Sequence, residues 1–534
     1  MTIHSSATRT HRRRTALALG AGLCLAAGTA HSAGTLLIGM TAGDLPITTG
    51  NPDQGFEGYR FVGYNLYDTL ILWDLSQGQT AAGLRPGLAT EWSVDPNDKK
   101  RWIFKLRPGV KWHDGCSFTA DDVVWNMSRS TNDKAPEFDP NQFAQARAYL
   151  TNFAGVEKID DYTVAFTTKT VDSLFQFNIS YVMMVSPCRA KEVKYNWVEY
   201  AAKPSGTGPF RFDKATPHQR MELLPNKAYW DPKRVPKLDR LVLIPMPEAS
   251  TRTAALLSGQ VNWIEAPAPD AVARLKSSGM TIVTNAYPHN WTYQLNFVKG
   301  PFTDKRVRQA ANYALNRTDM KEMLNGLMLE GYSTITPSTP YYGNPQLYKH
   351  DPAKAKALLK EAGCVPCNVT FAISTSGSGQ MQPLPMNELV KSNLEEVGFK
   401  VTLQTMDWNA LLDITRAGVD KFPEISAINV SRAGQDPFNA LVRHVWTTAH
   451  SPRGANWGHY SNPDMDQLVT NVMSEFDPDK RNVLLTKMNE MMNEDAALIF
   501  VAHDLNPRAM SPKVKGFVQA QSWFQDLTPV TVTP

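Results

Sequence analysis

The sequence predicts an α/β protein of two or three domains, and three observations support this. Segments with the apolar pattern of strands alternate with segments patterned like helices along most of the chain. The 534 residues exceed what a single hydrophobic core usually organises. The 36 prolines and 33 glycines are spread through the chain, which is typical of many short turns between folded elements.

The first 33 residues predict a cleaved secretory signal peptide. Four arginines between positions 9 and 14 precede an apolar run at 16–27, and small residues follow as far as Ala33. This order keeps the charges in the cytoplasm, places the apolar run in the membrane and presents small side chains to the peptidase. A membrane anchor would need a run of about 20 apolar residues, which this segment does not provide. We therefore expect export to the periplasm, with cleavage near Ala33.

The charge balance excludes a nucleic-acid partner. Removing residues 1–33 deletes four arginines and no acidic residue, so Lys plus Arg falls from 55 to 51 and equals the number of Asp plus Glu. The mature chain is therefore close to neutral and lacks the basic footprint of a nucleic-acid-binding protein.

Four cysteines remain after the leader: Cys116, Cys188, Cys364 and Cys367. In an oxidising compartment, paired structural disulfides are the expected state. The Cys-Val-Pro-Cys motif that begins at Cys364 can be either a thioredoxin-like redox motif or a local disulfide. A redox motif opens a helix after a strand, whereas here a predicted helix at 351–362 precedes the motif and a predicted strand at 369–374 follows it. A local disulfide is therefore favoured, which leaves Cys116 and Cys188 as the second pair.

The amino-terminal part of the mature chain begins with a predicted strand at 35–40. The segment 55–70 places apolar residues near one face of a helix. Strands at 91–94 and 101–106 flank an Asp-Pro-Asn-Asp turn and predict a hairpin. Thr119 is a good N-cap with two aspartates in the following turn, so a helix is expected to begin there.

The rest of the chain continues the alternation after a tight turn that begins at Gly206 and enters a strand. Strands are predicted at 238–246, 291–297, 369–374, 400–405 and 424–430. Helices are predicted at 248–257, 304–315, 352–362, 385–397, 407–417, 464–474 and 480–494.

Several longer motifs follow one another in a characteristic order. The stretch from Trp102 reads Trp-Ile-Phe-Lys-Leu-Arg-Pro-Gly-Val-Lys-Trp-His-Asp-Gly, and that from Phe118 reads Phe-Thr-Ala-Asp-Asp-Val-Val-Trp-Asn. Further stretches begin at Trp92, Pro204, Asn226, Phe302, Asp351 and Tyr460. Together they resemble the signature of the peptide/nickel/opine-type (family 5) extracellular solute-binding proteins of bacterial ABC importers, over essentially the whole mature chain.

The resemblance implies a type II periplasmic binding fold, in which two α/β lobes and an additional α/β domain close around a ligand at a hinge. The implied divisions are a discontinuous lobe I (34–66, 201–290 and 503–534), the additional domain (67–200) and lobe II (291–502). The implied function is that of the substrate-binding component of an ABC transporter, which captures a peptide or peptide-like small solute. Such a protein acts as a monomer without a cofactor and delivers its ligand to inner-membrane permease subunits.

The resemblance also indicates where charged ligand ends would be held. In dipeptide-binding relatives, an arginine after the strand corresponding to 369–374 binds the peptide carboxylate, and an aspartate before an Asp-Pro-x-Asn turn binds the amine. Here the first position has no arginine, and the second falls near Ala433, beside Arg432, although the turn is retained at Asp436. Arg432 would suit a carboxylate or another anionic group. Alternatively, it points to solvent or pairs with Asp436.

Other candidate ligand contacts follow from the same resemblance. Neutral hydrogen-bonding candidates are Ser376, Ser378, Gln380, Ser431 and Gln435. Aromatic candidates are Trp291 and Tyr293 at the expected hinge and Trp408, which either stacks on the ligand or packs in the core. Asp44 and Asn51 belong to the amino-terminal loop that lines the cleft in relatives.

A secreted hydrolase is the alternative from a different functional class. The sequence Gly-Ser-Gly around Ser378 is not a Gly-x-Ser-x-Gly elbow, and no His-Glu-x-x-His motif occurs. The densest histidine cluster, His444, His450 and His459, lacks a standard metal-ligand spacing. We therefore expect no catalytic residue and no metal site. An oligosaccharide, an opine or a metal chelate remains an alternative to a peptide as the ligand.

Overall fold

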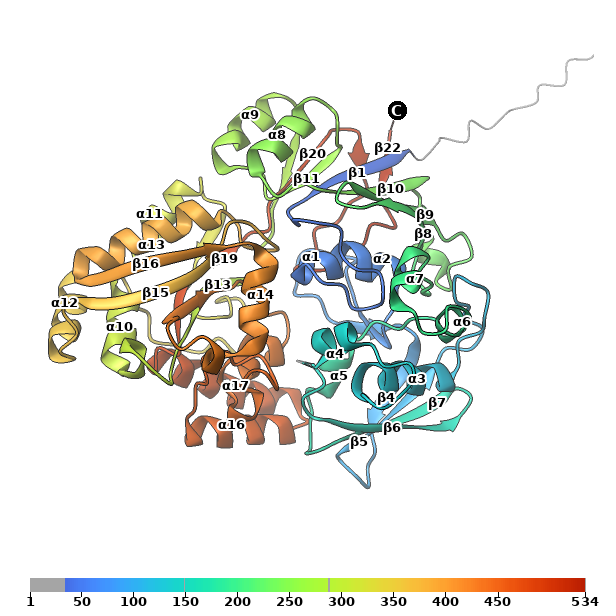
Figure 1. The fold of residues 1–534 in the computed structure, drawn as a ribbon, viewed down its shortest axis with the longest axis horizontal. Helices are drawn as coiled ribbons and strands as arrows, with labels where there is room; N and C mark the ends of the chain where they lie inside the picture. Colours follow the sequence, from blue (N-terminus) through green and yellow to red (C-terminus); the bar gives the residue numbers. More distant parts are fainter. Residues whose placement is uncertain (1–33, 148, 287–288, 534) are drawn as a thin grey trace, which may run out of the picture. The chain divides into compact units, whose positions relative to one another are not determined.

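The computed structural model describes residues 34–147, 149–286 and 289–533, and the predicted signal peptide at 1–33 lies outside the described residues. Three sheets of four or more strands organise these ranges (Figure 1). Within the same ranges, no helix combines the length and the apolar character needed to cross a membrane.

The first sheet has seven strands in the order β12-β20-β11-β1-β10-β9-β8. Its strand β1 (Thr35–Met40) coincides with the predicted first strand and lies inside the sheet, parallel to β10 and β11. The other strands are β8 (Phe210–Thr216), β9 (Arg220–Pro225), β10 (Arg240–Pro245), β11 (Trp263–Glu265), β12 (Thr281–Val283) and β20 (Arg508–Met510). Helices α8 (Ala249–Leu257) and α9 (Val272–Ser277) belong to the same stretch of chain.

The second sheet follows the order β14-β19-β13-β17-β15-β16, and a two-residue strand, β18, also pairs with β13. Its strands are β13 (His289–Leu295), β14 (Met328–Glu330), β15 (Cys367–Ser374), β16 (Phe399–Met406), β17 (Ala427–Asn429), β18 (Arg432–Ala433) and β19 (Leu498–Asp504). Its helices are α10 (Lys305–Ala314), α11 (Arg317–Met323), α12 (Pro352–Glu361), α13 (Pro383–Val397), α14 (Trp408–Ala417), α15 (Arg443–Val445), α16 (Pro463–Ser474) and α17 (Pro478–Glu494).

The third sheet has four antiparallel strands in the order β4-β5-β7-β6. They are β4 (Ala89–Val94), β5 (Arg101–Leu106), β6 (Phe153–Asp160) and β7 (Thr163–Thr168). Thr119 caps helix α3 (Ala120–Thr131) with a full capping box. The Thr119 side chain accepts the backbone N–H of Asp122, and the Asp122 side chain accepts the backbone N–H of Thr119. The other helices here are α4 (Pro140–Ala146), α5 (Phe175–Ile179), α6 (Pro187–Glu192) and α7 (Trp197–Ala202).

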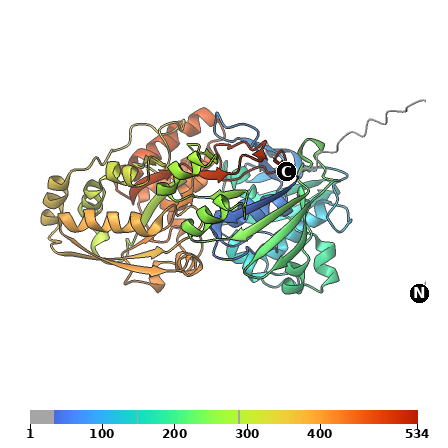
Figure 2. The same ribbon diagram turned by 90° about the horizontal axis from the view of Figure 1, so that it is seen from above.

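Two short connections carry the chain between the first and second sheets (Figure 1, and from above in Figure 2). One leads from β12 to β13, and the other leads from β19, which ends at Asp504, to β20, which begins at Arg508. Two further pairs of short strands, β2 (Ile71–Trp73) with β3 (Leu84–Pro86) and β21 (Val514–Lys515) with β22 (Thr531–Val532), complete the fold. The predicted lobe boundaries at 66, 200, 290 and 502 stay a prediction.

The predicted helix at 55–70 is shorter than expected and irregular. It consists of α1 (Gly55–Gly58), a π-helical turn (Tyr59–Gly63) and α2 (Tyr64–Leu66). The helix ends at Leu66, where the turn around Gly208 packs against the chain. The Gly208 N–H donates to the Leu66 carbonyl at 3.0 Å. A Cβ at Gly208 would lie 2.5 Å from the backbone there, so only glycine allows this approach.

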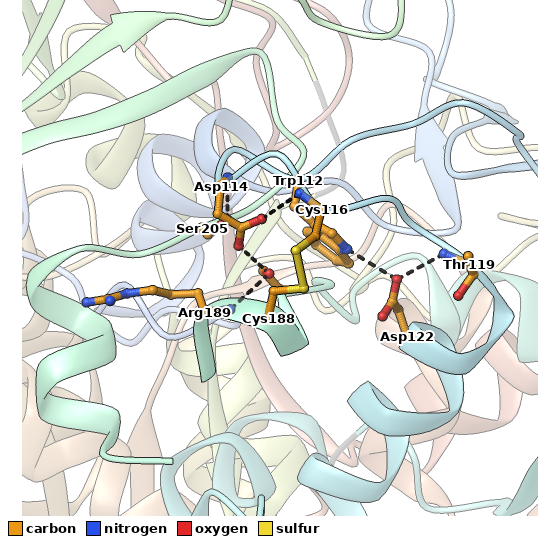
Figure 3. Close-up of a disulfide and its surroundings, with 9 residues drawn as sticks. Trp112, Asp114, Cys116, Thr119, Asp122, Cys188, Arg189 and Ser205 are labelled. Carbon is orange, nitrogen blue, oxygen red and sulfur yellow. Dashed lines mark hydrogen bonds between the residues drawn. A yellow bond between two sulfur atoms is a disulfide. The ribbon is translucent and has the colours of Figure 1, made fainter. Parts of the chain in front are cut away.

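Two disulfides are present in the described ranges. Cys116–Cys188 joins the loop after β5 to α6, and Figure 3 shows its surroundings. The Asp114 carboxylate beside it accepts the Cys116 N–H at 3.0 Å and the hydroxyl of Ser186. Cys364–Cys367 ties the end of α12 to the start of β15 across a separation of only 3 residues.

Removing the two disulfides is expected to have unequal effects on stability. A crosslink stabilises mainly by restricting the unfolded chain, and the effect grows with the loop that it closes. Replacing Cys116 and Cys188 (separation 72) with alanine should lower the free energy of unfolding by about 4 kcal/mol. The same change at Cys364 and Cys367 should lower it by about 2 kcal/mol. Urea denaturation of both variants tests this, and a larger loss at the short loop would contradict it.

Candidate functional site

A cavity of about 100 Å³ is lined by residues from three distant stretches of the chain. Gly55 and Tyr59 come from the first stretch, and Arg147 and Tyr149, which follow α4, come from the second. Arg432, on strand β18 of the second sheet, belongs to the third. Among the described residues that line this cavity there is no Asp, Glu, His or Cys. No cluster of three or more possible metal ligands occurs within the described ranges.

Four arginines dominate the polar lining of the cavity: Arg147, Arg416, Arg432 and Arg443. Arg147 follows the last residue of α4 and donates from Nη2 to the carbonyl of Arg416 at 3.2 Å. Arg416 lies in the last turn of α14 and donates from Nη1 to Asp413 at 2.9 Å. Arg443 begins α15 and donates from Nη1 to Asn439 Oδ1 at 2.5 Å.

Arg432 is the least satisfied of these cations. Arg432 is 9% exposed. Within the described part of the chain, its Nε and Nη2 atoms have no hydrogen-bond partner. Burial, followed by the charge of Arg443, lowers its pKa to about 9, so the group is still protonated at neutral pH.

Asp436 does not serve as the partner of Arg432. Its carboxylate accepts the Tyr181 hydroxyl at 2.7 Å and the Asn439 side-chain amide at 2.8 Å. Arg432 therefore neither points to solvent nor pairs with Asp436, the two alternatives that the sequence left open. Two buried guanidinium nitrogens without partners are costly, and an anionic group would satisfy them.

Aromatic side chains form another part of the cavity wall. Trp408 begins α14 behind the N-cap Asp407 and is 5% exposed. Its indole lies against Gly377, where an added Cβ would meet Cδ2 at 2.5 Å, so a larger residue there would displace the ring. Tyr149 stacks on Tyr181 with ring centroids 4.7 Å apart. The cavity thus offers flat apolar contact beside its cations.

The loop after β15 is fixed by Gln380 rather than left free for a ligand. The Gln380 side chain donates to Ser374 Oγ and to the Asn429 carbonyl, both at 3.0 Å, and accepts the Ser431 N–H at 2.9 Å. Ser378 lines the cavity, and its Oγ accepts the Glu57 N–H at 2.7 Å. This bond ties the amino-terminal stretch to the second sheet.

The structure brings four of the sequence-predicted ligand residues together at the cavity: Ser378, Trp408, Ser431 and Arg432. The other seven do not line it. Trp291 and Tyr293 are fully buried in the core of the second sheet, and Trp291 donates to the Gln380 carbonyl at 3.1 Å.

The remaining predicted residues lie elsewhere. The Asn51 side chain accepts the Met183 N–H at 2.7 Å, and the Gln435 side chain accepts the Ser522 hydroxyl at 2.7 Å. Asp44 lines a separate surface hollow, where it contacts His218 at 2.7 Å. Ser376 is half-buried in the loop before Ser378.

Seven cavity residues with polar or aromatic side chains were not singled out from the sequence: Tyr59, Gln145, Arg147, Tyr149, Thr415, Arg416 and Arg443. Arginines at helix ends usually complement the helix dipole, so no local signal distinguishes these from ordinary surface arginines.

Comparison with known proteins decides the family. Residues 83–467 match the model of the bacterial extracellular solute-binding proteins, family 5, middle region. The chain belongs to this family. The dipeptide-binding protein of Escherichia coli is 27% identical to this solute-binding protein over 479 residues, which is 85% of this chain and 86% of that protein. Heme-binding protein A of Haemophilus influenzae is 27% identical over 497 residues, covering 89% and 88% of the two chains.

Solved structures confirm the predicted fold class of the solute-binding protein. The periplasmic binding protein DppA of Helicobacter pylori, in complex with the peptide STSA, aligns with a TM-score of 0.83 at 25% identity and covers 94% of this chain and 98% of its own. The binding protein AgaA from A.tumefacien R10, in complex with agropinic acid, aligns with a TM-score of 0.79 at 21% identity and covers 94% of this chain and 99% of its own. The fold is therefore the two-lobed α/β fold of type II periplasmic binding proteins.

Proposed function

We propose that this protein is the periplasmic substrate-binding component of an ABC importer and that it captures a peptide or peptide-like small solute. The observation that carries the proposal is the cavity, which draws its lining from three distant stretches of the chain around four arginines. Closure of such stretches around a solute excludes water and strengthens each polar contact. Relatives named for binding dipeptides, and the Salmonella typhimurium relative named as a periplasmic oligopeptide-binding protein, support the ligand class.

The proposal assigns direct ligand contacts to Arg432, Ser378, Ser431 and Trp408. Arg432 would bind an anionic group, the two serines would offer neutral hydrogen bonds, and the indole would contact the apolar part. Gln380 and Trp291 would position the loop that carries Ser378. The division into lobe I, the additional domain and lobe II at the predicted boundaries is part of the same proposal.

The proposal also covers the cellular setting. The exported protein would act as a monomer, release its ligand unchanged to inner-membrane permease subunits, and catalyse no reaction. The described lining residues include no Asp, Glu, His or Cys, which are frequent general bases, and this supports the non-catalytic role.

A thermal-shift screen of the mature protein tests the proposed function. A ligand that binds only the folded state, at 100 times its Kd, stabilises it by about 2.7 kcal/mol, which raises the Tm of a chain this long by about 2–3 °C. The panel should include dipeptides, acidic and N-acylated peptides, opines, oligosaccharides and metal chelates. We expect a shift with peptide-like members. A shift with oligosaccharides alone, or turnover of any bound compound, would contradict the proposal.

A further inference from the structure

The four arginines all line one cavity, and we group them into two pairs by their strongest mutual interactions. Arg443 exerts the larger effect of the two arginine charges that act on Arg432, and Arg416 exerts the smaller one, so the two pairs also influence each other. Arg147 and Arg416 are joined by the 3.2 Å hydrogen bond from Nη2 of Arg147 to the Arg416 carbonyl, and their charges also interact. The four side chains come from four different elements or element ends, so the fold brings them together in space.

Each pair contains one arginine that faces no carboxylate in the described residues. Asp436 acts on Arg443, and Asp53 and Asp413 act on Arg416. The Asp413 side chain is 75% exposed, so solvent screens its contribution. Arg432 and Arg147 have no acidic partner among the groups that influence them.

The neighbouring titratable groups do not supply the missing negative charge. His444 is buried beside Arg443 and Arg432, and burial followed by these two charges holds its pKa well below the ordinary value. Burial raises the pKa of Tyr149, so this phenol is neutral as well. Arg432 is buried and Arg147 is half-buried, and neither has a counter-charge among the described residues. The unpaired charge is costly above all at Arg432, unless a ligand supplies an anionic group.

We propose that the ligand is a small dicarboxylate, with one carboxylate held by Arg432 and Arg443 and the other by Arg147 and Arg416. This inference rests on the proposed function and narrows its ligand class. The guanidinium fork matches a carboxylate with two parallel hydrogen bonds, and Nε and Nη2 of Arg432 are the two donors of such a fork.

The same lining selects against a free amine. An ammonium group needs a carboxylate or several acceptors when it is buried, and no acidic side chain lines the cavity in the described residues. Any nitrogen of the ligand is therefore acylated or otherwise neutral. The apolar part of the ligand would contact Trp408 and Leu412, which line the same cavity. An N-acylated acidic amino acid has this combination of groups.

Calorimetric titration with matched probes tests the inference. N-acetyl-L-glutamate and glutarate carry two carboxylates, glutaramate carries one, and glutaramide carries none; L-glutamate adds a free amine, and inorganic phosphate tests another dianion. We expect the two dicarboxylates without an amine to bind at least tenfold more tightly than glutaramate, and glutaramide to show no binding. Failure of every dicarboxylate to bind overturns the inference. Binding of neutral or zwitterionic peptides in that case leaves the proposed function standing, whereas no binding by any solute overturns both.

Variants with glutamine separate the two arginine pairs. Arg432→Gln and Arg147→Gln should each weaken glutarate binding by more than a factor of ten and reduce its advantage over glutaramate. Arg453→Gln is the matched control, because Arg453 is exposed and is not among the residues that line the cavity. Phosphate binding that exceeds glutarate binding would assign the pairs to one compact dianion and overturn the dicarboxylate.

The melting temperature of the ligand-free variants distinguishes a ligand-binding role from a structural one. Because Arg432 has unpartnered buried donors without ligand, Arg432→Gln should leave the Tm unchanged or raise it. A clear fall in the Tm together with unchanged glutarate affinity would assign Arg432 to the framework and overturn its role in binding.

Discussion

Replacing Glu265 with glutamine is expected to lower the free energy of unfolding by about 3–5 kcal/mol. Glu265, on β11, is 3% exposed and accepts hydrogen bonds from Arg508 Nε at 3.1 Å, from Trp263 Nε1 at 2.7 Å and from Arg60. Burial raises its pKa, but Arg508 and Arg60 outweigh this and hold the pKa below the ordinary value. The neutral amide would remove the carboxylate charge that faces the buried guanidinium groups of Arg60 and Arg508.

Urea denaturation at neutral pH measures this loss, and Glu157→Gln is the matched control. Glu157 also pairs with an arginine, Arg101, at 2.6 Å, but its side chain is 62% exposed. Exposed pairs contribute about 0–1 kcal/mol, because solvent screens them. Equal effects of the two substitutions would show that burial does not set the strength of the Glu265 interactions.

The second large effect is a pH dependence that originates at Glu57. Burial, followed by the charge of Glu265, raises the pKa of Glu57 to about 7, although the hydroxyl and N–H of Thr41 donate to its carboxylate. Between pH 4.5 and 7 the folded protein therefore retains a proton that the unfolded chain has released. Stability falls as the pH rises through this window, by about 3 kcal/mol for this group.

Comparison with Glu57→Gln isolates this contribution. Asp504, whose pKa burial raises to about 7, acts in the same direction as Glu57. His113 and His503 act in the opposite direction, because burial lowers the pKa of each to about 4. These groups are common to both proteins, so the stability of Glu57→Gln relative to wild type should increase by about 3 kcal/mol from pH 4.5 to pH 8. A difference that is constant with pH would show that Glu57 is ionised throughout.

Much of the fold could be predicted from the sequence, because local signals and the structure agree. The strand at 35–40 and the hairpin strand at 101–106 coincide with β1 and β5. Asp351 and Asp407 accept backbone N–H groups at the starts of α12 and α14, as expected for N-caps. The elements that were missed, such as β18 and β20, are two or three residues long and exist only because distant strands pair with them.

The candidate site was less predictable, for two physical reasons. Motif resemblance locates single positions such as Arg432, but the tertiary fold determines which other residues lie next to them. Arg147 and Arg443 are 296 positions apart in the chain, and nothing near either one signals the other. In addition, a polar residue close to a binding loop can be used entirely by the framework, as Gln380 is. Sequence pattern does not separate these two roles.

The place of β20 in the first sheet affects how the chain reaches its folded state. This strand comes from near the carboxyl end, yet it is inserted between β11 and β12, which precede it by more than two hundred residues. Until Arg508–Met510 has been synthesised, β11 and β12 each keep an unpaired strand edge. Unpaired edges can pair with the strands of other chains. Final assembly of this sheet must therefore await almost complete synthesis of the chain. Truncation ahead of β20 would leave the same edges exposed permanently and should produce aggregation instead of a smaller working protein.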